Sequence, residues 1–298
     1  MKLSLIVLTN FYPAAQQAVR YADALASTLG SRLVLLHVDR GFHMDPYLFP
    51  GEAWRRQALE EQEETGTQLE RLAGQLRAPA TVAQAPDLEA DVLRDLAQRH
   101  HPALFVLGQA APGTAAPEDL NATALQMLRT TQLPVLLVPA GTTAPALPRR
   151  VMVAVDSEEF RLTDAAACVS CLLANRDLEP TVVHVSAVED DQLCTNALRA
   201  AQRSGLLAGM PKADLRGYES EHPAEGILAA IRDTQADLVV LPARRRSYLN
   251  QLFHRSVTAQ VVRQSPVPVL LVPALEPAAP REHAHPHEAD DQLSWPRN

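Results

Sequence analysis

The sequence predicts an α/β protein built from two tandem, doubly wound domains, each a five-stranded parallel sheet flanked by helices. The first observation behind this is a repeat, because residues 134–140 (PVLLVPA) recur letter for letter at 268–274. At the same spacing, residues 104–107 (LFVL) match 238–241 (LVVL), and a duplicated domain accounts for both matches. The second observation is that each half alternates short β-branched runs with longer amphipathic stretches, which is typical of β-α units in a parallel sheet.

The expected elements follow one another in the same order in both halves. The β-branched runs predict strands over residues 2–8, 32–38, 80–84, 103–108 and 135–138, and then over 151–155, 181–186, 213–218, 237–241 and 269–272. Several of these runs are apolar without alternation, which indicates that helices cover both faces of each sheet. The amphipathic stretches predict helices over residues 13–29, 52–76, 87–99 and 120–130, and then over 160–174, 192–204, 223–234 and 248–264.

Composition shifts mark the domain boundaries. The first domain is expected over residues 1–140 and the second over 150–274. Residues 141–149 contain Gly and Pro with little apolar content, so they are interpreted as a linker. Residues 275–298 are rich in Pro, His and acidic residues without periodicity, which predicts a disordered tail.

Charge and hydropathy narrow the classes of partner. The net charge of −8 argues against nucleic acid, because binding to a phosphate backbone depends on a cationic surface. No apolar run reaches the roughly 18 residues that a membrane-spanning helix needs, and no secretory pattern follows Met1. The three cysteines are few and odd in number, which fits a reducing compartment. We therefore expect a cytoplasmic protein without nucleic-acid or membrane partners.

The landmarks taken together resemble the universal stress protein family, in the form that carries two such domains in one chain. Each half starts with a run such as 6–11 (IVLTNF) or 151–156 (VMVAVD), passes through a second strand ending in His-Val, and closes with Pro-Val-Leu-Leu-Val. Residues 253–258 (FHRSVT), which come before the last helix, are a further match to the family. The resemblance covers roughly residues 1–140 and 150–274, and it implies a Rossmann-like fold and a stress-response role.

The same resemblance implies where a nucleotide site would lie. In members of the family that bind ATP, an Asp ends the first strand and a G-x2-G-x9-G-[ST] segment follows the fourth. Glycines let backbone amides approach phosphates, and the hydroxyl at the helix start adds a donor. The first copy keeps Gly108 but has Asn10 in place of the Asp, and Ala111, Asn121 and Ala122 at the later positions. This pattern is a degenerate ATP-binding motif.

The second copy departs from the motif in another way. It keeps Asp156 and Ser256, but Pro242, Arg245 and Arg255 occupy the three glycine positions. Side chains at these positions fill space that phosphates need, so no cofactor is expected, and ATP and AMP are the ligands to test. The cations around this loop have three interpretations: a guanidinium-based anion site, a solvated loop, or ion pairs with the protein's own acidic surface. They are Arg244, Arg245, Arg246, His254 and Arg255.

Two functions from different classes follow. The first is a non-enzymatic stress-response module that acts through protein contacts, since no conventional catalytic motif occurs and no catalytic residue is assigned. The second is a nucleotide- or anion-binding sensor, weakly ATP-hydrolysing at most, that uses the crevice of the second copy. Carried over by position, Asp156 would bind the adenine or ribose edge, Val185 would form the wall beside the base, and Arg245 or Arg255 would supply charge to phosphate. Ser256, Val257 and Thr258 would lie at the helix start.

The resemblance also implies how the two domains meet. In family dimers the last strand commonly pairs across the interface, and here the two last strands are expected over 135–138 and 269–272. An apolar edge strand in each copy needs covering, and the tandem chain supplies the partner, so a pseudo-dimer is expected, with protein partners or a homodimer beyond it.

Other candidate sites have weaker support in the sequence. Cys168 and Cys171 have redox spacing, but the small residues around them predict a helix interior in which both thiols are buried. The histidines at 283–287 lie in the expected tail, so no metal site is assigned. His37 and His184 precede the ends of matching strands and are interpreted as structural.

Overall fold

The structure is a computed structural model that describes residues 2–38, 52–111, 120–142, 147–174, 177–244 and 256–276. The elements of the first half are β1 (Ser4–Thr9), α1 (Pro13–Leu29), β2 (Arg32–Val38), α2 (Glu52–Gln75), β3 (Ala80–Ala85), α3 (Ala90–Arg99), β4 (Ala103–Gln109), α4 (Leu120–Thr131) and β5 (Val135–Pro139). Those of the second half are β6 (Arg150–Ala154), β7 (Arg161–Leu162), the 3-10 helix η2 (Asp164–Cys168), α5 (Val169–Leu173), β8 (Glu179–Ser186), α6 (Asp191–Arg203), β9 (Asp214–Glu219), α7 (Pro223–Asp233), β10 (Leu238–Arg244), α9 (Val257–Gln264) and β11 (Val269–Leu275).

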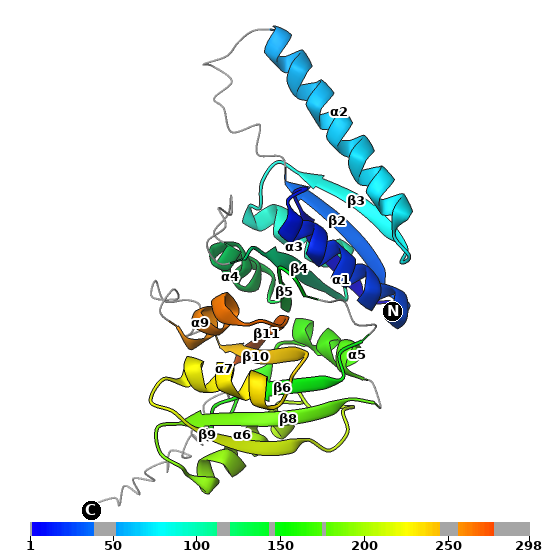
Figure 1. Cartoon of the computed structure of the whole chain (residues 1–298). Helices are drawn as coiled ribbons and strands as arrows, with labels where there is room; N and C mark the ends of the chain where they lie inside the picture. The colour runs from blue at the N-terminus through cyan, green and yellow to red at the C-terminus, as the bar shows by residue number, and fades with distance from the viewer. Residues whose placement is uncertain are drawn as a thin grey trace, which may run out of the picture.

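The strands of both halves join in one sheet, with the order β3-β2-β1-β4-β5-β11-β10-β6-β8-β9 (Figure 1). Within each half neighbouring long strands run parallel, as the apolar runs predict. The halves meet where β11 pairs antiparallel with β5, in a register that sets Leu270 opposite Leu136. The expected last-strand pairing is therefore present inside the chain, and each half covers the apolar edge of the other.

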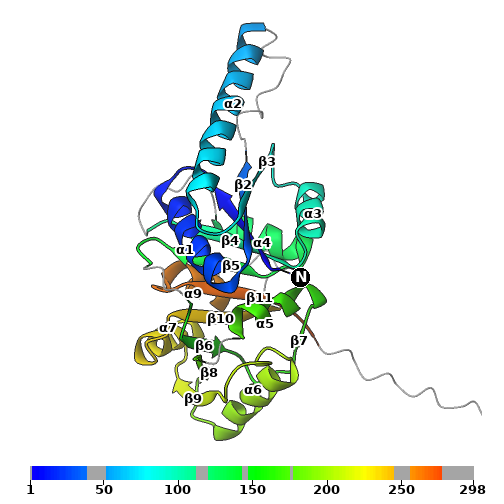
Figure 2. The same cartoon turned by 90° about the vertical axis from the view of Figure 1, so that its right-hand side faces the viewer.

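Two helical layers cover the sheet, one on each face (Figure 2). Residues of α1, α2, η2, α5 and α6 pack on one face, and residues of α3, α4, α7 and α9 pack on the other. Strand residues alternate between the layers, so that Val182 packs with the first layer and Val183 with the second. Each apolar cluster contains residues from both halves, and the hydrophobic core is therefore continuous across the domain boundary.

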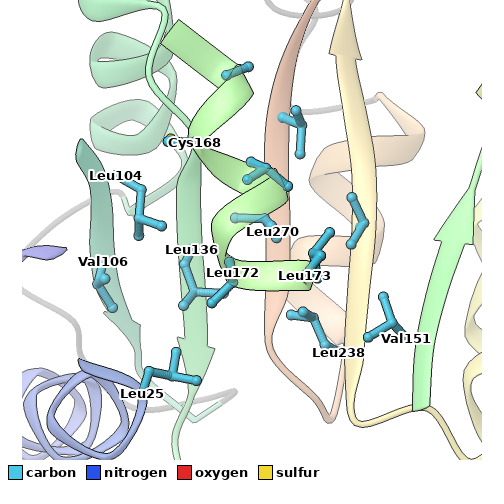
Figure 3. Packing of buried hydrophobic residues seen from close by; sticks show 14 of the residues in the cluster. Leu25, Leu104, Val106, Leu136, Val151, Cys168, Leu172, Leu173, Leu238 and Leu270 are labelled. Carbon is cyan, nitrogen blue, oxygen red and sulfur yellow. The ribbon is translucent and has the colours of Figure 1, made fainter. Parts of the chain in front are cut away.

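Helix α5 lies over the seam between the halves. Leu172 and Leu173 point down from it toward Leu136 of β5 and Leu270 of β11 (Figure 3). Polar contacts cross the same boundary. They are Thr163 Oγ1 donating to Gln132 O (3.1 Å), Gln109 Nε2 donating to Arg263 O (3.1 Å) and Cys168 Sγ donating to Ala103 O (3.4 Å). The halves therefore share packing as well as strand pairing.

The predicted helix over 160–174 is wrong in its first part. Arg161 and Leu162 are extended and pair with the end of β11. Thr163 keeps an extended backbone and its hydroxyl accepts from Ala166 N, so helical structure begins only after it. Cys168 is the last residue of η2, more than one 3-10 turn after its start, and α5 continues directly from it; its thiol is buried as expected.

The last predicted helix is shorter than expected in the described residues. Helix α9 begins at Val257, because Ser256 has an extended backbone and its side chain accepts from Ala259 N at 3.2 Å. Residues 248–255 of that prediction lie outside the described residues, and so does the predicted tail from residue 277 onward.

The two strand histidines make the same contact in both halves. His37 Nδ1 lies 3.0 Å from Thr9 O, and His184 Nδ1 lies 3.0 Å from Val155 O. A carbonyl oxygen only accepts, so each Nδ1 carries the proton and donates it to the end of the first strand of its half. This duplicated contact supports the structural interpretation of both residues.

Candidate functional site

A cavity of about 320 Å³ lies at the carboxyl ends of β6, β8 and β10 in the second half. This is the region where open parallel sheets bind ligands. Five of the residues predicted for the site lie together on the wall of this cavity: Asp156, Val185, Ser256, Val257 and Thr258. Arg245 and Arg255, the other two predicted residues, lie outside the described residues.

Apolar side chains form most of the cavity wall. Val183 and Val185 project from β8, Ile227 from α7 and Leu241 from β10. Helix α7 approaches β8 closely at Gly226, where an added Cβ would lie 2.5 Å from a methyl carbon of Val185. The glycine therefore sets how near the helix lies to the strand, and so how narrow the cavity is on this side.

Arg244 is the buried cation of the site. Its side chain is only 6% exposed although it ends β10, and it forms an ion pair with Asp156. Its Nη1 donates to Glu158 Oε2 at 3.0 Å and to a backbone carbonyl at 3.3 Å, and its Nη2 donates to Glu158 O at 2.7 Å. The guanidinium also lies 5.6 Å from the ring centre of Phe160. Of the three interpretations of the cation cluster, pairing with the protein's own acids holds for Arg244.

Asp156 is held inside this network. Its Oδ1 accepts from Arg244 Nη2 and from the backbone N of Glu158 at 3.1 Å. The carboxylates of Asp156 and Glu158 are 50% and 55% exposed, whereas the guanidinium between them is buried. The group thus carries two negative charges around one positive charge, and that positive charge faces protein oxygens.

The start of α9 supplies hydroxyl groups to the opposite wall. Ser256 caps the helix, and its hydroxyl keeps a hydrogen for donation to a ligand while its oxygen accepts from Ala259 N. Val257 is 37% exposed and lines the cavity, as does Thr258. The wall formed by α9 therefore combines an apolar contact with polar contacts.

The corresponding end of the first half is arranged differently. A Cβ on Gly108 would lie 2.0 Å from Ala14 O, so the start of α1 is pressed against the end of β4. Asn10, in the position of Asp156, accepts from Tyr12 N at 3.4 Å. Phe11 between them has a φ of 58° and its ring contacts the ring of His37. The start of α1, Asn10 and Phe11 thus lie together at the carboxyl end of the first-half sheet.

In the part of the chain that the structure describes, no cluster of three or more His, Cys, Asp or Glu side chains is arranged to hold a metal ion. No described helix combines the length and apolar character needed to cross a membrane. The histidines at 283–287 lie outside the described residues.

The chain is similar to several solved structures. A universal stress protein from Archaeoglobus fulgidus is 18% identical, with 90% of this chain and 97% of that chain covered and a TM-score of 0.67. The cytoplasmic domain of a prokaryotic cation chloride cotransporter is 13% identical, with 93% and 96% covered and a TM-score of 0.51. An Archaeoglobus fulgidus universal stress protein in complex with dAMP is 20% identical, with 42% and 97% covered and a TM-score of 0.28.

Sequence comparison adds the family itself. None of the curated protein sequences compared with the chain is similar to it. The family model described as "Universal stress protein family" matches twice, over residues 4–139 and 148–273, which together span most of the chain. The two matches coincide with the two halves of the sheet, so the chain belongs to the universal stress protein family and carries two of its domains in tandem.

Proposed function

We propose that the chain is a non-enzymatic, cytoplasmic stress-response protein whose second domain binds a small ligand of the nucleoside or mononucleotide type. In this proposal the first domain serves as the packed partner of the second. The observation that carries it is the convergence of five predicted site residues on one cavity at the carboxyl ends of the second-domain strands. At the carboxyl end of the first-domain sheet, the start of α1 is pressed against Gly108 of β4.

The size and chemistry of the cavity support this class of ligand. Its volume of about 320 Å³ is at the lower end of the roughly 300–1,000 Å³ typical of small-molecule sites. Valine, isoleucine and leucine side chains suit the faces of a flat ring, and the hydroxyls of Ser256 and Thr258 suit the polar edge of a sugar. Among the described residues of this wall no nucleophile is paired with a base, which supports a binding function.

Calorimetric titration of the full chain tests this proposal. The ligands are adenosine, AMP, ATP and dAMP, and we expect at least one to bind with a Kd in the micromolar range. The variant Val257→Trp places a large ring at a partly exposed position of the cavity wall, and it should weaken that binding at least about tenfold, or about 1.4 kcal/mol.

The matched control is Leu215→Trp. Leu215 is similarly exposed, at 36%, and pairs with Val182, so it lies on the opposite face of the sheet from the cavity. Its variant should bind as the parent chain does. If none of the four ligands bound the parent chain, or if both tryptophan variants lost binding equally, the cavity would not be the ligand site.

A second candidate function is a module that acts through protein contacts. Helix α2, 24 residues long, extends beyond the sheet (Figure 1), whereas the corresponding helix of the second half, α6, has 13 residues. The extra length offers a surface that the second half lacks.

Sedimentation over a wide concentration range tests whether a second copy is the contact partner. We expect the mass of one chain throughout, because the β5 and β11 edges are already paired with each other. A two-chain mass at micromolar concentration would identify a homodimer and favour the contact function.

A further inference from the structure

Helix α7 forms one side of the second-domain cavity and lies close to strand β8. Pro223 and Ile227 of the helix line the cavity, and so does Val185 of the strand. Gly226 is the buried residue of α7 that lies against the Val185 side chain. The position of α7 over β8 therefore decides how these wall residues stand relative to one another.

The backbone of α7 does not itself require a glycine at residue 226. Gly226 lies inside the helix, it is not among the described glycines with a positive φ, and a helix interior favours alanine over glycine. A glycine at such a position has a packing reason. An added Cβ would lie 2.5 Å and 3.2 Å from the two methyl carbons of Val185, and 3.2 Å from the Cβ of Ser220. The absence of a side chain is therefore what allows α7 to lie against Val185.

The far end of α7 is attached to the sheet by separate contacts. Asp233, the last residue of the helix, accepts from Tyr218 Oη at 2.6 Å and from Arg216 Nη1 at 3.0 Å. Both donors lie on β9, the strand that pairs with β8. The carboxyl-terminal end of α7 is thus fixed to the sheet independently of Gly226, and the contact at Gly226 sets the height of its first turns.

An alanine at residue 226 would have two ways to find room. Val185 could turn about its Cα–Cβ bond, which moves a side chain that lines the cavity. Alternatively, the first turns of α7 could move away from the sheet, and these turns carry Pro223 and Ile227. Either response changes the shape of the wall against which the ring of a ligand would rest.

We propose that Gly226 is a positioning residue of the second-domain site, which sets the separation of α7 and β8 and so holds Val185 where it meets the face of a nucleoside ring. This inference rests on the proposed function, because it names what gives that site its fit to a flat ring. Gly226 acts through Val185 and needs no contact of its own with the ligand.

A double-mutant cycle, read out by calorimetric titration of the full chain with adenosine, AMP, ATP and dAMP, tests the proposal. Gly226→Ala should weaken the binding of each ligand that the parent chain binds by roughly tenfold, because all four ligands carry the same ring and the wall beside it moves. In the Val185→Ala background the same change at residue 226 should alter binding by less than about threefold, since the methyl groups that an alanine would meet are gone.

Urea unfolding of the parent chain, the two single variants and the double variant provides a readout that needs no ligand. Gly226→Ala should lower the unfolding midpoint when Val185 is present. It should raise the midpoint in the Val185→Ala background, where the helix preference for alanine over glycine remains. The matched control is Gly74→Ala in α2, where an added Cβ has no atom within 4 Å, and this variant should bind the ligands as the parent chain does.

The outcomes separate this inference from the proposed function. An equal loss of affinity from Gly226→Ala in both backgrounds, or no loss when Val185 is present, would overturn the positioning role and leave the ligand-binding function intact. If none of the four ligands bound the parent chain, the proposed function would be overturned and this inference with it. The unfolding midpoints would then still show whether Gly226 and Val185 are in contact.

Discussion

Gly108→Val is expected to destabilise the protein by about 3 kcal/mol or more, because overpacking that moves backbone costs at least as much as overpacking that moves side chains. A Cβ at residue 108 would lie 2.0 Å from Ala14 O, 2.3 Å from Ala14 C and 2.8 Å from Ala15 N. All three atoms belong to the backbone at the start of α1, so no rotamer change relieves the contact. Urea denaturation followed by circular dichroism measures the decrease in the free energy of unfolding.

The control for this prediction is Gly74→Ala in helix α2. An added Cβ there has no atom within 4 Å, and alanine is favoured over glycine in a helix by roughly 0.5–1 kcal/mol. This variant should be unchanged or slightly more stable. A Gly108→Val protein as stable as the Gly74→Ala protein would mean that the start of α1 is not pressed against β4.

Leu270→Ala should cost about 2–5 kcal/mol, the usual range for a fully buried leucine. Leu270 is 0% exposed, it pairs with Leu136 of the first half, and it lies beneath α5 (Figure 3). Both apolar clusters run through this seam, so the lost packing is shared by the two domains. The protection of amide hydrogens should therefore fall in both halves together.

Hydrogen exchange read out by mass spectrometry can follow the two halves separately. Peptides that contain β1 and β4 report on the first half, and peptides that contain β6 and β8 report on the second. Leu215→Ala, at an exposed position on an outer strand, serves as the control and should change stability by less than about 0.5 kcal/mol. Faster exchange in the second half alone after Leu270→Ala would contradict the shared core.

Much of the fold could be predicted from hydrophobic patterning and the repeat. Helix α1 has the predicted bounds, because an amphipathic run between Pro13 and Gly30 has clear signals at both ends. The failure over 160–174 has a tertiary cause. Residues 161–162 are drawn into pairing with the end of β11, a contact across more than a hundred residues that no local signal reports. Tertiary context overrode local propensity there.

Part of the cavity lining could be anticipated from the sequence. Asp156, Ser256 and their neighbours lie on one cavity, because the topology fixes where strand ends meet, and their role in binding a ligand stays a prediction. The burial of Arg244 could not be predicted from the residues next to it in the sequence, since a run of three arginines is typical of a solvated loop. The available signal was the acidic stretch 156–159 (DSEE), which the strand order brings beside the end of β10.

The antiparallel seam between β5 and β11 reverses the strand direction from one domain to the next. The carboxyl ends of the two parallel sets consequently point to opposite rims of the molecule, and a single small effector cannot touch both. If a ligand bound in the second-domain cavity changed the position of helix α2 in the first domain, the change would be transmitted through the paired strands β5 and β11 and through α5. The second-domain cavity and the carboxyl end of the first-domain sheet therefore lie at opposite edges of the molecule.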